Sequence, residues 1–218
     1  MQGLRTACKE AAWVFGLSRL LILIGSLSIY LLPVLIPHFT QYTMWKVPYK
    51  GGSYTPTAYF FSWLRWDGGV YANLAFRGYR YPPDVAFFPL WPLLEHFAGL
   101  LLGGHFPISY YLGGLVLANL CFYFALVLLY CLLIKDFDRA IARRTMFYFA
   151  FSPYALFFFM GYSESLFVLL SIAVFLLLRR GNPLDWWLAG FLGFLATLTR
   201  STGLLLAIPF LVIYAQRF

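Results

Sequence analysis

The sequence predicts an all-α, polytopic membrane protein, and two properties of the whole chain support this fold class. Of its 218 residues, 62% are hydrophobic, 22% are aromatic and 11% are charged. A soluble domain is about half apolar and carries about a quarter charged residues, so this composition excludes one. The apolar residues also gather into segments, and a helix needs roughly 20 of them to cross a hydrocarbon core about 30 Å thick.

Six apolar segments follow one another along the chain. They cover approximately residues 13–36, 110–134, 145–160, 165–178, 186–199 and 203–214. The first is too long for a signal-peptide core and has no small-residue cleavage site, so it is interpreted as a spanning helix. The last three are short for independent spans, which leaves tilt, re-entry or shifted ends open. Arg19, inside the first segment, is expected to snorkel toward the near surface.

Basic residues in short loops indicate which face of the protein is cytoplasmic. If all six segments span, the following residues fall on one side: Arg5, Lys9, Lys135, Arg139, Arg143, Arg144, Arg179, Arg180 and Arg217. The formal charge of +8 is therefore interpreted as a topology signal, since a nucleic-acid binder would cluster its charge on a soluble face. Residues 1–218 are predicted to form a single transmembrane domain, with the long loop 37–109 on the extracytoplasmic face.

Several kinds of chemistry are disfavoured by what the sequence lacks. The cysteines are Cys8, Cys121 and Cys131, and the histidines are His38, His96 and His105. Their scatter predicts no disulfide framework and no zinc site. The chain has no GxGxxG, P-loop, GxSxG or EF-hand motif. We therefore expect neither a metal nor another cofactor.

The loop 37–109 is rich in aromatic residues and proline, a composition typical of a segment at the membrane interface. Its apolar part AFFPLWPLLEHFAGLLLGGH is interrupted by Pro89 and Pro92. A seventh span there would disturb the alternation of basic loops. The loop is therefore predicted to contain interfacial or re-entrant helices.

Four motifs in this order carry a resemblance to a known family: WDGGVYANLAFRGY, AFFPLWPLL, GYSESLFVLL and TRSTGLLLAIP. From about Phe60 to Pro209 the chain resembles the membrane mannosyltransferases related to the enzyme that adds the second mannose in GPI-anchor assembly (GPI mannosyltransferase 2, PIG-V type). These belong to the class C (GT-C) glycosyltransferases. The resemblance includes prokaryotic relatives of unassigned substrate. Such relatives generally continue with several further helices, so we expect this chain to be the N-terminal part of a longer or split GT-C module, with a partner membrane subunit in the latter case.

The resemblance implies an inverting hexosyltransferase that is integral to the plasma membrane of a bacterium or archaeon, or to the endoplasmic reticulum of a eukaryote. A sugar would pass from a polyprenyl-phosphate donor to a hydroxyl of a lipid or glycan acceptor on the extracytoplasmic face. In that class an acidic residue of the first extracytoplasmic loop is the catalytic base. Asp67 matches this position.

The reaction itself requires similar groups. An acceptor hydroxyl is a poor nucleophile near neutral pH, so a carboxylate within hydrogen-bond reach should take its proton. Trp66 is expected to desolvate Asp67 in part. A departing lipid phosphate needs positive charge beside it, for which Arg200 is the first candidate. The predicted substrate-binding residues are Trp66, Arg65, Arg77, Arg80, Asp84, Glu164 and Arg200.

Each of these residues also has a structural interpretation. Asp67, followed by two glycines, fits a turn or a helix cap, and Asp84 after two prolines fits a loop turn. Glu164 between two serines fits a helix N-terminus. Arg200 fits an anchor at the interface. Glu95 is expected to be structural.

Two other functions remain open. The first is a noncatalytic subunit that binds or transports a polyprenyl lipid, although a transporter more often carries its charges deep within its spans. The second is an inactive, truncated paralogue. Glycoside hydrolysis is disfavoured, because nothing identifies two carboxylates at a suitable separation.

Overall fold

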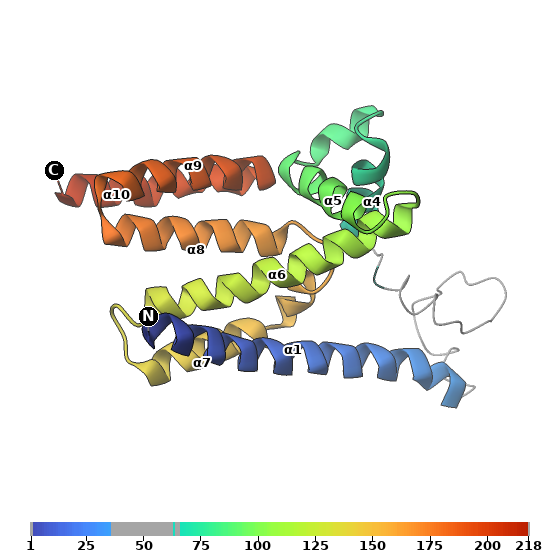
Figure 1. The fold of residues 1–218 in the computed structure, drawn as a ribbon, viewed down its shortest axis with the longest axis horizontal. Helices are drawn as coiled ribbons and strands as arrows, with labels where there is room; N and C mark the ends of the chain where they lie inside the picture. Colours follow the sequence, from blue (N-terminus) through green and yellow to red (C-terminus); the bar gives the residue numbers. More distant parts are fainter. Residues whose placement is uncertain (1, 36–62, 64–65, 218) are drawn as a thin grey trace.

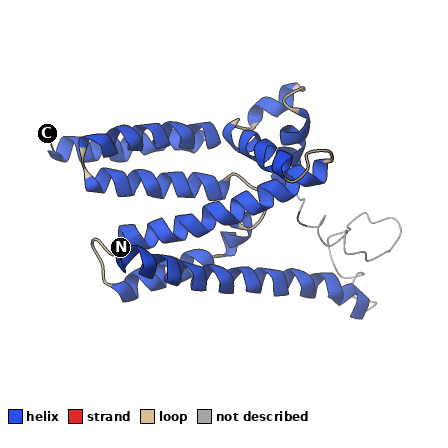
Figure 2. Ribbon diagram, viewed as in Figure 1, coloured by secondary structure: helices blue, strands red, loops and turns tan. Residues whose placement is uncertain are grey.

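The computed structural model of the protein describes residues 2–35, 63 and 66–217. These residues form helices and connecting turns without a strand, as Figure 2 shows, which confirms the all-α prediction for this part of the chain. The elements are α1 (Gln2–Leu35), α4 (Asp67–Arg77), η1 (Pro82–Ala86), α5 (Leu90–Leu101), α6 (Pro107–Leu133), α7 (Arg139–Ala150), η2 (Pro153–Phe158), α8 (Glu164–Arg180), α9 (Pro183–Thr199), η3 (Ser201–Leu206) and α10 (Ala207–Arg217).

The long helices lie side by side, and successive segments run in alternating directions (Figure 1). The described ends of the chain, the α6–α7 connection and the α8–α9 connection lie at one end of the bundle, while α4 and α5 cover the other. The basic residues at the start of α7 and at the end of α8 therefore lie at the end of the bundle that carries the described ends of the chain. This grouping agrees with the predicted topology, although which end faces the cytoplasm stays a prediction.

Two helices are long and apolar enough to cross a membrane. They cover residues 3–28 within α1, with a mean hydropathy of 1.7, and residues 107–133 in α6, with a mean hydropathy of 2.4. They correspond to the first two predicted spans. By contrast, α8 and α9 have 17 residues each, so the remaining four spans stay predictions.

The third predicted segment, 145–160, is divided in the structure. Helix α7 begins earlier, at Arg139, because the Asp138 side chain accepts a hydrogen bond from the Ile141 amide at 2.8 Å and caps the helix. It ends at Ala150, and the 3₁₀ helix η2 follows from Pro153. Proline lacks an amide hydrogen and disfavours helical geometry in the residue before it, which accounts for the break.

Helices α4, η1 and α5 confirm that the described part of the loop 37–109 is helical; residues 37–62, 64 and 65 lie outside the described residues. Helix α4 ends at Gly78, which has a φ of 74° and whose amide donates a hydrogen bond to the Leu74 carbonyl. Glycine adopts this geometry easily. Pro92 lies in the first turn of α5, where amide hydrogens have no helical partner. Proline therefore accompanies the start of α5 rather than breaking it.

Arg19 corrects the prediction that it would snorkel to the surface. Its side chain lies between α1, α6 and η2, where the residue is 7% exposed. Nη2 donates to the Phe158 carbonyl at 2.9 Å, and the guanidinium lies 4.5 Å from the Phe122 ring and 4.9 Å from the Phe15 ring. The end of η2 supplies a carbonyl, and the rings supply cation–π attraction, so the cation stays inside.

Candidate functional site

Helix α4 begins at Asp67, directly after a residue with unusual backbone geometry. Trp66 has a φ of 49°, a conformation that costs a residue with a side chain about 1–3 kcal/mol and often occurs at functional sites. Asp67 is exposed, and the described residues give its carboxylate no hydrogen bond or ion pair. The expected desolvation by Trp66 is not seen, because Trp66 is itself 61% exposed. The carboxylate is therefore open to a ligand.

Two buried tyrosines lie behind Asp67. Tyr71, one helical turn further along α4, shares a hydrogen bond of 3.1 Å with the Ser163 hydroxyl. The hydroxyl of Tyr162 accepts the Gly68 amide hydrogen. Burial raises the pKa of Tyr71 and raises that of Tyr162 to about 12. Both phenols are thus protonated and neutral near pH 7.

The third component is an ion pair between Arg200 and Glu164. Glu164 is the first residue of α8, and Arg200 follows the last residue of α9 in an extended conformation. Arg200 Nη1 donates to Glu164 Oε1. The chain then turns into η3 through Gly203, where an added Cβ would lie 2.5 Å from the Thr197 nitrogen. Only glycine allows this close return, so the TRSTG motif determines where Arg200 is held.

These groups belong to one region of the protein, since Asp67, Glu164 and Arg200 all lie within electrostatic range of Tyr71. We call the set the Asp67 cluster; its members are Asp67, Tyr71, Tyr162, Ser163, Glu164 and Arg200. Asp67, Glu164 and Arg200 were predicted from the sequence. The phenols and Ser163 were not, although Tyr71 follows Asp67 by one helical turn and the other two belong to the GYSES motif.

Three other predicted residues lie at the opposite end of α4. Arg77 donates to both carboxylate oxygens of Asp84, at 2.7 and 2.9 Å. The amides of Arg80 and Tyr81 also donate to Asp84, at 2.9 and 3.0 Å. The Arg77 guanidinium, followed by the Arg80 amide, holds the pKa of Asp84 well below its usual range. We call this arrangement the Asp84 corner. Arg65 lies outside the described residues.

The two parts of α4 are well separated. Ten residues of helix between Asp67 and Arg77 correspond to about 15 Å along the axis. Arg77, Arg80 and Asp84 are therefore not brought to the Asp67 cluster. Among the described residues, no group of three or more His, Cys, Asp or Glu side chains could hold a metal ion.

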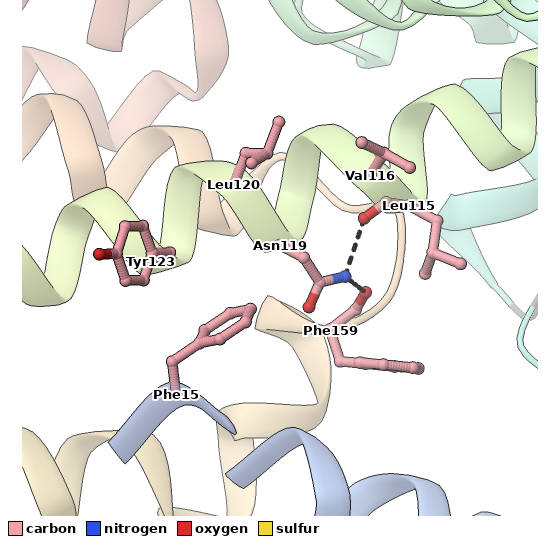
Figure 3. Close-up of a pocket in the computed structure, with 7 residues that line it drawn as sticks. All are labelled: Phe15, Leu115, Val116, Asn119, Leu120, Tyr123 and Phe159. Carbon is pink, nitrogen blue, oxygen red and sulfur yellow. Dashed lines mark hydrogen bonds between the residues drawn. The ribbon is translucent and has the colours of Figure 1, made fainter. Parts of the chain in front are cut away.

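An apolar cavity of about 400 Å³ lies between α1 and α6 (Figure 3). Its lining consists of Phe15, Leu115, Val116, Asn119, Leu120, Tyr123 and Phe159. The side-chain amide of Asn119 donates hydrogen bonds to the carbonyls of Leu115, at 2.8 Å, and Phe159, at 2.9 Å. Phe159 also packs edge-on against Trp63, with ring centroids 4.9 Å apart. The lining carries no charge, so the cavity suits a hydrocarbon chain.

The described residues define a helical protein with two helices able to cross a membrane. At one end they bring together an exposed carboxylate, which has no partner among them, and an arginine–glutamate pair. The chain belongs to the mannosyltransferase (PIG-V) family, whose model matches residues 53–217. This membership confirms the resemblance that the four motifs indicated.

Three relatives are similar to the chain. The GPI mannosyltransferase 2 of Schizosaccharomyces pombe is 30% identical over 155 residues, covering 69% of this chain and 32% of the relative. The GPI alpha-1,6-mannosyltransferase 2 of Mus musculus is 34% identical over 153 residues, covering 64% and 29%. That of Cricetulus griseus is 33% identical over 155 residues, with the same coverage. The chain thus spans about a third of the length of these relatives. No solved structure matches it.

Proposed function

We propose that this chain forms the catalytic end of a membrane glycosyltransferase that moves mannose from a polyprenyl-phosphate donor to a hydroxyl of a lipid or glycan acceptor. The reaction takes place on the extracytoplasmic face, and Asp67 is its general base. The names of the relatives, all GPI mannosyltransferases, support the sugar and the reaction class. The observation that carries the proposal is the exposed carboxylate of Asp67, which has no partner among the described residues, in the same cluster as Arg200.

Asp67 is suited to accept a proton. Because its carboxylate is exposed and has no partner among the described residues, an acceptor hydroxyl can approach without displacing an existing hydrogen bond. The hydroxyl oxygen attacks the anomeric carbon while its proton passes to the carboxylate. The bond between that carbon and the phosphate oxygen breaks from the opposite side, so the configuration inverts.

The departing phosphate keeps the electron pair and gains negative charge. Arg200 uses Nη1 for Glu164, and a guanidinium has further N–H donors that can bind phosphate oxygens. Glu164 holds the arginine in place before the substrate arrives, as preorganised stabilisation requires. The neutral phenols of Tyr71 and Tyr162 place no negative charge beside the phosphate.

The donor's isoprenoid chain occupies the apolar cavity of Figure 3. Phe159 belongs to its lining, and Tyr162 of the cluster lies three residues further along the chain. A lipid chain in this cavity would therefore lie next to its phosphate at Arg200. This arrangement places the donor between the bundle interior and the end that carries α4.

The test is the substitution Asp67→Asn in the complete protein. The amide keeps the size of the side chain but does not accept a proton at useful pH, so transfer of radiolabelled mannose from the polyprenyl-phosphate donor in membranes should fall about 100- to 10,000-fold. Protein level and membrane insertion should match wild type. Transfer at the wild-type rate would overturn the role of Asp67.

The apolar cavity also favours the second candidate, a noncatalytic polyprenyl-lipid-binding or transport subunit. Both candidates bind the lipid, but only the transferase loses its activity with Asp67→Asn. A complete wild-type protein that binds the donor and transfers no sugar would favour the binding subunit.

A further inference from the structure

Helix α5 carries a carboxyl group that the proposed reaction does not use. Glu95 is 0% exposed, and neither of its oxygens has a hydrogen-bond partner among the described residues. Burial raises its pKa well above the usual range. An ionised carboxylate without a partner is very costly in such surroundings, so the group holds its proton.

The position of this carboxyl group is determined by close helix packing. A Cβ on Gly114 of α6 would lie 2.3 Å from Glu95 Oε1, and one on Gly113 would lie 2.8 Å from the Gly99 nitrogen of α5. These distances are shorter than real contacts allow, so α5 and α6 approach through glycines. The carboxyl group therefore rests directly on the α6 backbone.

The same face of α5 contacts the loop that supplies the Asp67 cluster. Trp91, one turn before Glu95, donates its indole N–H to the Gly161 carbonyl at 3.2 Å. Gly161 in turn packs on Gly114, where an added Cβ would lie 3.4 Å from the Gly114 carbonyl carbon. Glu95, Gly114 and Gly161 thus pack in succession, and Gly161 precedes Tyr162 in the chain.

A buried tyrosine links the carboxyl group to the cluster. Tyr111 of α6 is 1% exposed, and its hydroxyl has no hydrogen-bond partner among the described residues. Glu95 and Tyr162 both lie within electrostatic range of this hydroxyl. Tyr162 accepts the amide hydrogen next to Asp67, so the series runs from Glu95 to the proposed base.

We propose that Glu95 is an uncharged carboxylic acid that, with Tyr111, positions Tyr162 and the Gly161–Glu164 loop for sugar transfer. This inference rests on the proposed function. A neutral acid can pack against the α6 backbone at Gly114 without bringing an uncompensated negative charge into a buried site. Glu95 is thus a positioning residue and does not contact the reacting atoms.

Infrared spectroscopy of the complete protein in lipid nanodiscs tests the charge state without any assay of activity. At pH 7 we expect a C=O stretching band of a protonated carboxylic acid that is lost in Glu95→Gln. Asp84→Asn is the matched control and should leave the band unchanged, because Asp84 is ionised. A spectrum in which Glu95→Gln removes no such band would overturn the inference.

Sugar transfer tests the positioning role. Glu95→Gln, which keeps the size and shape of the uncharged acid, should retain kcat within about twofold. Glu95→Met, which lacks the planar head group that packs against Gly114, should lower kcat about tenfold with an unchanged KM for the donor. Tyr111→Phe should match Glu95→Met, and the double variant should add little, since coupled residues are not additive. Wild-type kcat in Glu95→Met and Tyr111→Phe would overturn the positioning role of Glu95. A loss of transfer in Glu95→Gln as large as that in Asp67→Asn would also overturn it.

An inactive wild-type protein would refute the proposed function, while the infrared result would still decide whether Glu95 is charged.

Discussion

Helix α4 has a carboxylate near each end, and the two are held in opposite ways. Asp84 receives two hydrogen bonds from Arg77 and one from each of the Arg80 and Tyr81 amides. Asp67 receives none from the described residues, and the arginine in its cluster is paired with Glu164 instead. A carboxylate whose lone pairs are all engaged stabilises a loop, whereas one without partners remains able to take a proton. The comparison therefore separates an acid with a structural role in η1 from the proposed catalytic acid at the start of α4.

The first prediction concerns the extracytoplasmic face on which both carboxylates are predicted to lie, and its expected effect is all or none. Val85, 78% exposed in η1, is predicted to lie outside, and Arg144 near the start of α7 inside. In a background without the native cysteines, Val85→Cys in intact cells should react with a membrane-impermeant maleimide, and Arg144→Cys should react only after permeabilisation. The reverse pattern would contradict the topology and the proposed site together.

The second prediction compares the two arginines. Arg200→Gln removes a cation from the departing phosphate and should lower kcat about 100- to 1000-fold, in the range for loss of one transition-state donor. Arg200→Lys should recover part of this loss. Arg77→Gln is the matched control, because its guanidinium is committed to Asp84; it should lower stability and change kcat far less. Equal loss of kcat in Arg200→Gln and Arg77→Gln would contradict a role in phosphate binding that Arg200 has and Arg77 lacks.

The third prediction concerns the apolar cavity, where a substitution should affect binding of the lipid donor but not the chemical step. Val116, 52% exposed, lines this cavity, so Val116→Trp should fill it and raise the KM for the polyprenyl donor about tenfold while kcat stays unchanged. Phe124→Trp is the control, since Phe124 is similarly exposed on α6 and does not line this cavity. Unchanged donor KM in Val116→Trp would place the isoprenoid chain elsewhere.

The fourth prediction has the smallest effect on transfer. Asp84→Asn should leave transfer within about fivefold of wild type, since Asp84 contacts no reacting atom, while the thermal midpoint at pH 7 falls. Because the pKa of Asp84 is lowered in the folded state, its stabilisation is present above the unfolded value of about 3.9 and is lost as the pH falls below it. The difference between the two midpoints should therefore shrink below about pH 4. A constant difference would show that charge is not what Asp84 contributes.

Much of the helical architecture could be predicted because it depends on local sequence. Apolar length identifies α1 and α6, and the Asp138 cap and Pro153 give physical reasons for the bounds of α7 and η2 that the apolar pattern alone missed. Asp67, Glu164 and Arg200 were selected through motifs and chemistry. The chemistry of the reaction predicts that Asp67 and Arg200 face one site, but the pairing of Arg200 with Glu164 could not be predicted, since it depends on how α8 and α9 pack.

The buried ionisable groups were the least predictable. From the sequence, Arg19 resembles a residue near the end of a span; its burial depends on the Phe158 carbonyl at the end of η2. Glu95 is one acid in an apolar helix, and its burial depends on Gly113 and Gly114, which allow α6 to approach α5 closely. Tyr111 has no sequence feature that marks its hydroxyl as unpaired. Burial of this kind arises between elements distant in sequence, so no local pattern reports it.

The carbonyl oxygen of Phe158 accepts hydrogen bonds from Arg19 of α1 at 2.9 Å and from Ser165 of α8 at 3.1 Å. A single backbone atom thus ties the N-terminal helix to the helix that begins with Glu164. An unrelated hydrophobic anchor of the same length would hold the protein in a bilayer, yet it would leave this tie unmade and the aromatic rings around Arg19 without their cation. Helix α1 is therefore not interchangeable, and a chimera that replaces it would alter the surroundings of the Asp67 cluster without changing any residue within it.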